Sequence, residues 1–290
     1  MGRSRLMKPE FEKDMVYLVQ IPRAGCIPSL SPFCLKLETW LRMAGIRYQN
    51  IDNKLTNNSS KGQIPFVELN GRELNDTNFI ISELTQYFSR ESMEMHLNTE
   101  QAANLHSYLR MAEESLRWVV VVERSKNGEI FITDQVGMGR QLSCPKKFFL
   151  RIIGIRFLKR GLKGSVQKQG YGRFSEEELN AVAKSDLKAL DGFLGKKRFF
   201  FGDRPTRLDA SVFGVVGELL YVPSSKDTIQ KFIQLECPNL SGFMERVKVD
   251  FWPDWEEILK TGSMNTAYND SLQQDRGYSN PALQDTTTKL

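Results

Sequence analysis

The chain has 290 residues, of which 40% are hydrophobic and 26% charged, and its formal net charge is +5. These proportions are those of a globular protein, and the length suits one large core or two of medium size. No stretch approaches the ~18 uninterrupted apolar residues of a membrane-spanning helix, and the N-terminus lacks the apolar segment of a secretory signal. We therefore expect a cytoplasmic protein that is not secreted and has no transmembrane helix.

The cysteines and histidines show no metal or dithiol pattern. The four cysteines are widely spaced and none forms a C-x-x-C pair, which argues against a zinc ribbon and a dithiol redox motif. The two histidines have no cysteine or carboxylate at metal-ligand spacing. We expect no metal site, and a reducing compartment suits so few cysteines.

Strand-like and helix-like patterns alternate in the N-terminal third of the chain. Asn70-Gly71 predicts a hairpin turn, because both residues tolerate a positive φ. The order expected from hydrophobic periodicity is strand 15–21, helix 32–44, strand 47–51, hairpin strands 65–69 and 72–74, and a helix from 76. This is the order of a thioredoxin-like α/β domain, which we place at residues 15–90 after a flexible stretch at 1–14.

From residue 98 onward the apolar pattern is helical only. One long candidate helix spans 102–122, and two later helices begin with the capping boxes 175–178 and 206–209. We predict an all-helical domain at residues 98–260. The segment 261–290 is polar and has no apolar period, which predicts a disordered tail.

These elements resemble the glutathione transferase superfamily over roughly residues 15–255. More narrowly, the chain resembles the failed axon connections family, which is related to metaxins and to cadmium-responsive worm proteins. The resemblance is carried by residues 27–43 (IPSLSPFCLKLETWLRM), 170–178 (GYGRFSEEE), 208–214 (LDASVFG) and 251–253 (FWP). It implies a transferase-like architecture and a role in axon development. Some members carry an N-terminal membrane anchor, and we expect none here, because the first strand begins close to the start of the chain.

The resemblance also implies a glutathione site in the first domain. The hydroxyl of Ser31, at the start of the first helix, would face the sulfur of glutathione. A cis peptide bond between Ile64 and Pro65 would present backbone groups to the cysteinyl part. Asp76 and Thr77 would hold the γ-glutamyl end. Gln63, with Lys61, would lie near the glycyl carboxylate.

Each of these residues has a simpler structural explanation that stays open. Ser31 is a good helix N-cap, as are residues of the Asp76-Thr77 type at a helix start. The helix dipole favours a thiolate near Ser31 and near Cys34, which makes Cys34 an alternative nucleophile. A lone cysteine there is more often a small buried hydrophobe. The cis-proline loop is expected from the fold whether or not a ligand is used.

The cleft would lie between this site and the helix at 102–122, whose Tyr108, Met111 and Arg117 are candidate wall residues by position. We expect no covalently bound cofactor. Glutathione is the candidate ligand or co-substrate.

A basic block stands out in the second half of the chain. Residues 135–175 contain ten Lys or Arg and no Asp or Glu. On a helical wheel, one side collects Arg156, Lys159, Arg160 and Lys163, and apolar residues collect on the other. Phe149 intrudes on the basic side and Arg151 on the apolar side. The block is either a helix that docks on anionic lipid or a helix whose apolar side joins the core, and we favour the second.

Two functions remain open at this point. The family resemblance favours a binding or scaffold role in axonal development with weak or no catalysis. The alternative is a Ser-type glutathione transferase in which Ser31 stabilises the thiolate that attacks a small electrophile. Partners could be a protein, an anionic membrane surface or a second copy in a homodimer, and kinship with metaxins adds the mitochondrial outer membrane. No nucleic-acid module accompanies the basic charge.

Overall fold

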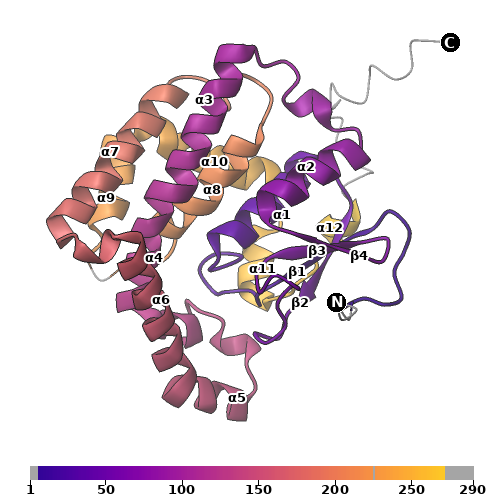
Figure 1. Cartoon of the computed structure of the whole chain (residues 1–290), viewed down its shortest axis with the longest axis vertical. Coiled ribbons are helices and arrows are strands. Elements are labelled where there is room, and N and C mark those ends of the chain that lie inside the picture. The colour runs from indigo at the N-terminus through magenta and orange to yellow at the C-terminus, as the bar shows by residue number, and fades with distance from the viewer. Residues whose placement is uncertain (1–5, 225, 272–290) are drawn as a thin grey trace.

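The structure is a computed structural model that describes residues 6–224 and 226–271 (Figure 1). Its four-stranded sheet has the order β2-β1-β3-β4 and consists of β1 (Val16–Gln20), β2 (Tyr48–Asp52), β3 (Phe66–Leu69) and β4 (Arg72–Asn75). β1 is parallel to β2 and antiparallel to β3, and β3 and β4 form the predicted hairpin. Helix α1 (Pro32–Met43) follows β1, and α2 (Thr77–Tyr87) follows β4.

The rest of the described chain is helical, which confirms the predicted architecture of a thioredoxin-like domain followed by an all-α domain. The helices are α3 (Thr99–Arg110), α4 (Arg117–Lys126), α5 (Cys144–Phe149), α6 (Ile155–Gln169), α7 (Glu176–Leu194), α8 (Arg207–Leu220), α9 (Thr228–Glu236), α10 (Pro238–Phe251), α11 (Trp255–Thr261) and α12 (Ala267–Ser271). Both predicted capping boxes are present, at the starts of α7 and α8.

Two π-helical turns interrupt the helical pattern. The helix predicted at 102–122 is α3 and α4 joined by the π turn Met111–Leu116. A second π turn, Leu150–Gly154, joins α5 to α6. Each such turn takes up one residue more than an α turn, so the residues before it face a different side from the one that uniform helical spacing predicts.

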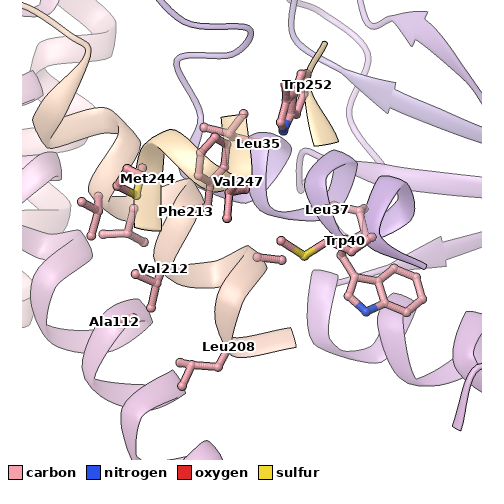
Figure 2. Packing of buried hydrophobic residues seen from close by; sticks show 14 of the residues in the cluster. Leu35, Leu37, Trp40, Ala112, Leu208, Val212, Phe213, Met244, Val247 and Trp252 are labelled. Carbon is pink, nitrogen blue, oxygen red and sulfur yellow. The ribbon is translucent and has the colours of Figure 1, made fainter. Parts of the chain in front are cut away.

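Helix α1 is the centre of the packing. Ser31 caps its N-terminus, Pro32 occupies the first helical position, and every residue from Cys34 to Met43 is buried. Figure 2 shows side chains of α1 facing those of α8 and α10 in one apolar cluster. The approach of α8 is close, because a Cβ at Gly214 would lie 2.4 Å from the carbonyl oxygen of Pro32. The two domains therefore share one core rather than meeting at a polar seam.

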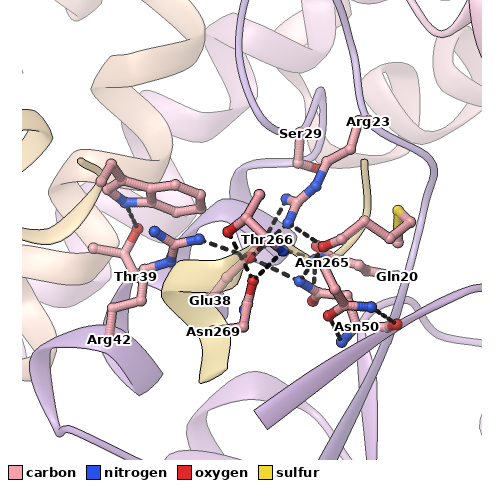
Figure 3. A network of polar contacts seen from close by, with 12 residues as sticks. Gln20, Arg23, Ser29, Glu38, Thr39, Arg42, Asn50, Asn265, Thr266 and Asn269 are labelled. Atoms are coloured by element: carbon pink, nitrogen blue, oxygen red, sulfur yellow. Dashed lines mark hydrogen bonds and ion pairs between the residues drawn. The ribbon is translucent and has the colours of Figure 1, made fainter. Parts of the chain in front are cut away.

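A buried polar network surrounds Glu38 of α1 (Figure 3). Arg23 binds its carboxylate through two hydrogen bonds of 2.6 and 2.7 Å, and Gln20 donates a further bond of 2.8 Å. One helical turn later, Arg42 pairs with Asp254 at 2.5 Å. Burial alone would raise the pKa of Glu38, but Arg23, Arg42 and Gln20 stabilise the anion and hold that pKa at about 2.

The same network holds the C-terminal segment against the first domain. Arg23 donates to the carbonyl oxygens of Ser263 and Met264, and the side chain of Asn265 bonds to the backbone of Asn50 in β2. Residues 261–271 therefore differ from the predicted disordered tail. The polar side chains of Asn265, Thr266 and Asn269 have hydrogen-bond partners within the structure, which composition alone does not reveal. Residues 272–290 lie outside the described residues.

The stretch predicted to be flexible at the N-terminus also contacts the sheet in its described part. The backbone N–H groups of Met7 and Lys8 donate to the carboxylate of Glu68, a buried residue of β3, at 2.6 and 2.9 Å. The buried carboxylate needs these donors, and the segment supplies them. Residues 6–14 are thus held at the sheet, and residues 1–5 lie outside the described residues.

The low pKa of Glu38 predicts acid sensitivity. Because the folded-state pKa is about 2 and the ordinary value is 4.5, the stabilisation is complete above about pH 4.5 and is lost as the pH falls towards 2. We expect this group to account for about 3 kcal/mol of the free energy of unfolding across that window. Urea unfolding of the wild type and of Glu38→Gln, measured between about pH 6 and pH 2, tests this.

The Glu38→Gln variant should be less stable near neutral pH, because Arg23 and Arg42 lose a buried counter-charge. Its stability should also depend less steeply on pH. Glu257→Gln, on an exposed part of α11, should unfold like the wild type. If Glu38→Gln kept the full pH dependence of the wild type, the role assigned to Glu38 would be wrong.

Candidate functional site

Ser31 lies at the N-terminus of α1 and acts as its cap. Its Oγ accepts a hydrogen bond from the backbone N–H of Cys34 at 3.3 Å, and its own N–H donates to Ser29 Oγ at 3.3 Å. The side chain is partly exposed. The cap uses a lone pair of the oxygen, so the cap itself does not take up the hydroxyl proton. The predicted capping role is therefore confirmed, and the geometry is compatible with thiolate binding.

Cys34 is not placed as a nucleophile. Its side chain is fully buried in the first turns of α1. Burial raises the pKa of its thiol to about 11, against the smaller opposite effect of hydrogen bonds from Ser31 and Ser29. A thiol of this kind is protonated and inaccessible at neutral pH. The burial of Cys34 favours the small buried hydrophobe over the alternative nucleophile.

The loop before β3 has the predicted backbone geometry. The Ile64–Pro65 peptide bond is cis, Pro65 is buried, and Ile64 is partly exposed. Gln63 and Lys61, expected near a glycyl carboxylate, are exposed on the preceding turn, and their N–H groups donate to Ser59 Oγ. The loop leaves these two polar side chains open to solvent.

Asp76 and Thr77 lie at the start of α2, and their side chains have different environments. Asp76 caps the helix through a 3.0 Å bond from the N–H of Asn78 and is partly exposed. Its φ is 67°, a left-handed value that residues other than glycine rarely adopt. Thr77 is buried, and its hydroxyl accepts a 3.2 Å hydrogen bond from Lys36 Nζ. The hydroxyl thus faces the protein interior.

Lys36 is a further residue of this region, and it was not among the predicted site residues. Its ammonium group is 1% exposed and contacts Glu113 at 2.5 Å and Asn78 Oδ1 at 2.8 Å, in addition to Thr77. These three acceptors use all three N–H groups of the ammonium. Lys36 therefore has no donor left for a ligand.

Glu113 comes from the π turn between α3 and α4 and completes the cluster from the other domain. Asn78 donates to Oε2 of Glu113 at 3.0 Å, and the hydroxyl of Ser211 on α8 donates to Oε1, the oxygen that contacts Lys36. Burial would raise the pKa of Glu113, but Lys36 and these donors outweigh burial and lower it. The ion pair thus joins α1, α2, α8 and the π turn in one buried contact.

The sequence does contain a signal for this cluster. Apolar residues such as Leu35, Leu37 and Leu41 occur on more than one side of the helix that contains Lys36. A helix that is apolar on several sides is expected to be buried, so its charged residues must be paired. The partner Glu113 could not be inferred, because it lies 77 residues away in an irregular turn.

The three predicted wall residues of the cleft have different surroundings in the structure. Arg117 lies over the ring of Phe33, with 5.3 Å from its guanidinium carbon to the ring centroid, and so approaches the start of α1 near Ser31. Tyr108 stacks on Phe193 of α7 at 4.1 Å, and Met111 packs at the edge of the apolar core. Of the three, Arg117 is the one that contacts the start of α1.

The basic residues predicted as membrane contacts lie elsewhere, on α6. Arg156, Lys159, Arg160 and Lys163 line an open cavity of about 1030 Å³ between α6 and the segment 129–134. The favoured interpretation of this helix, with its apolar side in the core, is wrong for most of its length, because α6 buries only Ile155 and Val166. Within residues 6–224 and 226–271, no helix has the length and apolarity to cross a bilayer. That same part of the chain contains no grouping of three metal-ligating side chains.

Two family models match the chain. The glutathione S-transferase N-terminal domain matches residues 32–130, and the glutathione S-transferase C-terminal domain matches residues 183–247. Among solved structures, a glutathione transferase from Phanerochaete chrysosporium has a TM-score of 0.56 at 15% identity, covering 82% of this chain and 98% of that chain. At this identity the likeness concerns the fold.

Three curated relatives complete the comparison. Failed axon connections of Drosophila melanogaster is 38% identical over 267 residues, which are 89% of this chain and 63% of that protein. The chain thus spans less than two thirds of the Drosophila protein. Isoprene-epoxide--glutathione S-transferase of Rhodococcus sp. (strain AD45) is 27% identical over 80% of this chain and 96% of that protein. Metaxin-2 of Mus musculus is 24% identical over 68% of this chain and 73% of that protein.

The Lys36–Glu113 pair predicts a strong non-additivity in stability. Lys36→Met or Glu113→Gln alone leaves one buried charge without its partner and should cost about 3–5 kcal/mol of unfolding free energy. The double variant removes both charges, so its cost should fall well below the sum of the two. Urea unfolding of the four proteins in a double-mutant cycle measures the coupling. Additive costs would contradict the direct pairing.

Proposed function

The chain belongs to the failed axon connections family of glutathione S-transferase-like proteins, and we propose that it serves axonal development as a binding or scaffold protein with weak or no catalysis. The observation that carries the proposal is the buried Lys36–Glu113 pair. The Lys36 ammonium group donates to the buried Thr77 hydroxyl and holds it towards the interior, and the family resemblance assigns Thr77 to the γ-glutamyl end of glutathione. Loss of one hydrogen bond to a charged ligand group weakens binding by about 1.5–3 kcal/mol.

The arrangement of charges supports the same proposal. The γ-glutamyl end of glutathione carries an α-amino group, and the cluster beside Thr77 already contains the Lys36 ammonium, neutralised by Glu113. Beside Thr77, a second ammonium group would have to share acceptors that Lys36 already uses, which leaves it the partly exposed Asp76 carboxylate. In this proposal the transferase fold serves as a binding surface for a protein partner in the cytoplasm. The shared core of the two domains makes that surface rigid.

A Ser-type glutathione transferase is the second candidate, and a specific observation favours it. Its support is that Ser31 and Asp76 are partly exposed at the starts of α1 and α2, and that the peptide bond before Pro65 is cis. The backbone of Asp76 is strained, and strained residues gather at ligand sites. In this reaction the glutathione thiolate, stabilised by the Ser31 hydroxyl and the α1 N-terminus, attacks an electrophilic carbon and opens an epoxide or displaces a leaving group.

Calorimetric titration of glutathione distinguishes the two functions. We expect a dissociation constant in the millimolar range or weaker for the wild type, and the same for Ser31→Ala. Ser175→Ala is the matched control, because it also removes a serine N-cap but lies at the start of α7. Each variant should lose about 1 kcal/mol of stability from its helix cap.

The opposite result would establish the transferase. Micromolar binding that weakens at least about tenfold in Ser31→Ala but not in Ser175→Ala corresponds to about 1.4 kcal/mol from the Ser31 hydroxyl. Conjugation of glutathione to an epoxide by the wild type, lost in Ser31→Ala alone, would contradict the non-catalytic role.

The axonal role is tested by replacement in Drosophila neurons that lack Failed axon connections. We expect the wild-type chain, Ser31→Ala and Ser175→Ala to restore axon connections to a similar extent, because the proposed role does not use the Ser31 hydroxyl. Protein levels of the three must be matched, since each cap variant is less stable than the wild type. Rescue by the wild type and Ser175→Ala but not by Ser31→Ala would count against a non-catalytic role.

A further inference from the structure

Exposed apolar side chains are concentrated at one place on the molecule. Among the described residues, thirteen large hydrophobic side chains are exposed, and six of them lie within 148–158. These six are Phe148, Phe149, Ile152, Ile153, Phe157 and Leu158. Phe157 is 71% exposed and Phe148 67%. Isolated exposed apolar residues are ordinary, but a cluster of aromatic and branched side chains indicates an interaction surface.

The position of this segment explains why it is uncovered. Helix α6 is anchored through Val166, which packs with Val122 of α4 and Leu179 of α7. Figure 1 shows α5 at the lower extremity of the molecule, with α6 running from it towards the other helices. The part nearest α5 therefore projects from the body, and the π turn Leu150–Gly154 has no buried residue.

The π turn brings like side chains together. Uniform helical spacing puts Phe149 on the basic side and Arg151 on the apolar side. The extra residue of the turn rotates the residues before it by about 100° relative to the residues after it. This rotation aligns Phe149 with Phe157 and brings Arg151 to the side of Arg156. In agreement, Arg151 lines the basic cavity with Arg156. The segment is therefore more clearly amphipathic than its sequence suggests.

Among the described residues, the charges beside the apolar face that have no ion-pair partner are all positive. Six cationic side chains line the cavity, against two carboxylates. The two carboxylates, Asp134 and Glu129, are paired with Lys147 and Lys159. In the part of the chain that the structure describes, no carboxylate lies within ion-pair distance of the other four, Arg151, Arg156, Arg160 and Lys163. Four cations next to an uncovered aromatic face complement a surface that is both anionic and apolar.

We propose that residues 144–163, here called the docking segment, bind the surface of a bilayer that contains anionic phospholipids. Phe149, Ile153 and Phe157 enter the boundary between headgroups and acyl chains, and the adjacent Arg and Lys side chains contact lipid phosphates. A bilayer offers both chemistries at one surface, whereas a soluble phosphate ligand offers no apolar partner. The docking segment is remote from Ser31, so this proposal stands whether or not glutathione binds.

Vesicle co-sedimentation of the full chain tests the proposal. We expect binding to vesicles with about 30% phosphatidylserine in phosphatidylcholine, and at least tenfold weaker binding to phosphatidylcholine alone. Binding should also fall when salt rises from about 0.05 to about 0.5 M. Arg156→Glu/Arg160→Glu should weaken binding about 25-fold or more, at about 1 kcal/mol for each cation lost near the surface. Phe149→Ala/Phe157→Ala should weaken it about tenfold or more.

Matched controls change the same chemistry elsewhere. Lys196→Glu/Lys231→Glu alters the net charge equally at exposed positions, and Phe79→Ala/Leu235→Ala removes equally exposed apolar side chains. Both controls should bind vesicles like the wild type. All four double variants alter exposed residues, so unfolding curves should confirm intact folds.

Several outcomes would overturn the proposal. One is the absence of sedimentation with the anionic vesicles at low salt. Another is equal loss in the controls, which would indicate a non-specific charge effect. A third is loss with the Arg pair but not with the Phe pair, together with tight binding of inositol hexakisphosphate, which would identify a soluble anion site instead of a membrane surface.

Discussion

The burial of α1 is the constraint on which the rest of the structure depends. Every residue from Cys34 to Met43 is buried, including the charged Lys36, Glu38 and Arg42. An uncompensated charge in such a place costs several kcal/mol, so each needs partners from other elements. Lys36 takes them from α2 and the π turn, Glu38 takes Arg23 from the loop before α1, and Arg42 takes Asp254 from the turn between α10 and α11. The charges of one helix thereby fix how both domains and the C-terminal segment are held.

This constraint also limits the functional site, because the candidate glutathione site is built on the same helix. The ammonium group of Lys36 must find three acceptors, and one of them is the Thr77 hydroxyl. The Lys36–Glu113 pair, which stabilises the contact between the domains, therefore also holds the Thr77 hydroxyl in the interior, away from the candidate ligand site. Ser31 lies outside this cluster, and its oxygen caps α1 through a lone pair, so the cap itself does not use the hydroxyl proton. In the candidate site, the hydroxyl proposed for the thiol of glutathione is partly exposed, and the hydroxyl proposed for its γ-glutamyl end is buried.

Much of the fold could be predicted from local sequence signals. Ser31, Asn70-Gly71 and the two capping boxes act through neighbours a few residues away, and the structure has each of them as predicted. The buried polar contacts could not be predicted, because they join residues far apart in the sequence. Lys36 and Glu113 are 77 residues apart, and Arg23 and Met264 are 241 apart. The polar segment from residue 261 was expected to be disordered, because its hydrogen-bond partners, Arg23 and Asn50, lie far away in the sequence.

Two further failures of prediction coincide with the two π turns. Helical periodicity assumes a constant rotation per residue, and one extra residue changes the face of every residue beyond it. In the first π turn, Met111–Leu116, the turn itself supplies the buried Glu113. In the second, Leu150–Gly154, the shift separates aromatic from basic side chains that are mixed on a regular wheel. Because π turns are frequent at functional sites, their positions here, at the domain joint and at the docking segment, give independent reason to test both places.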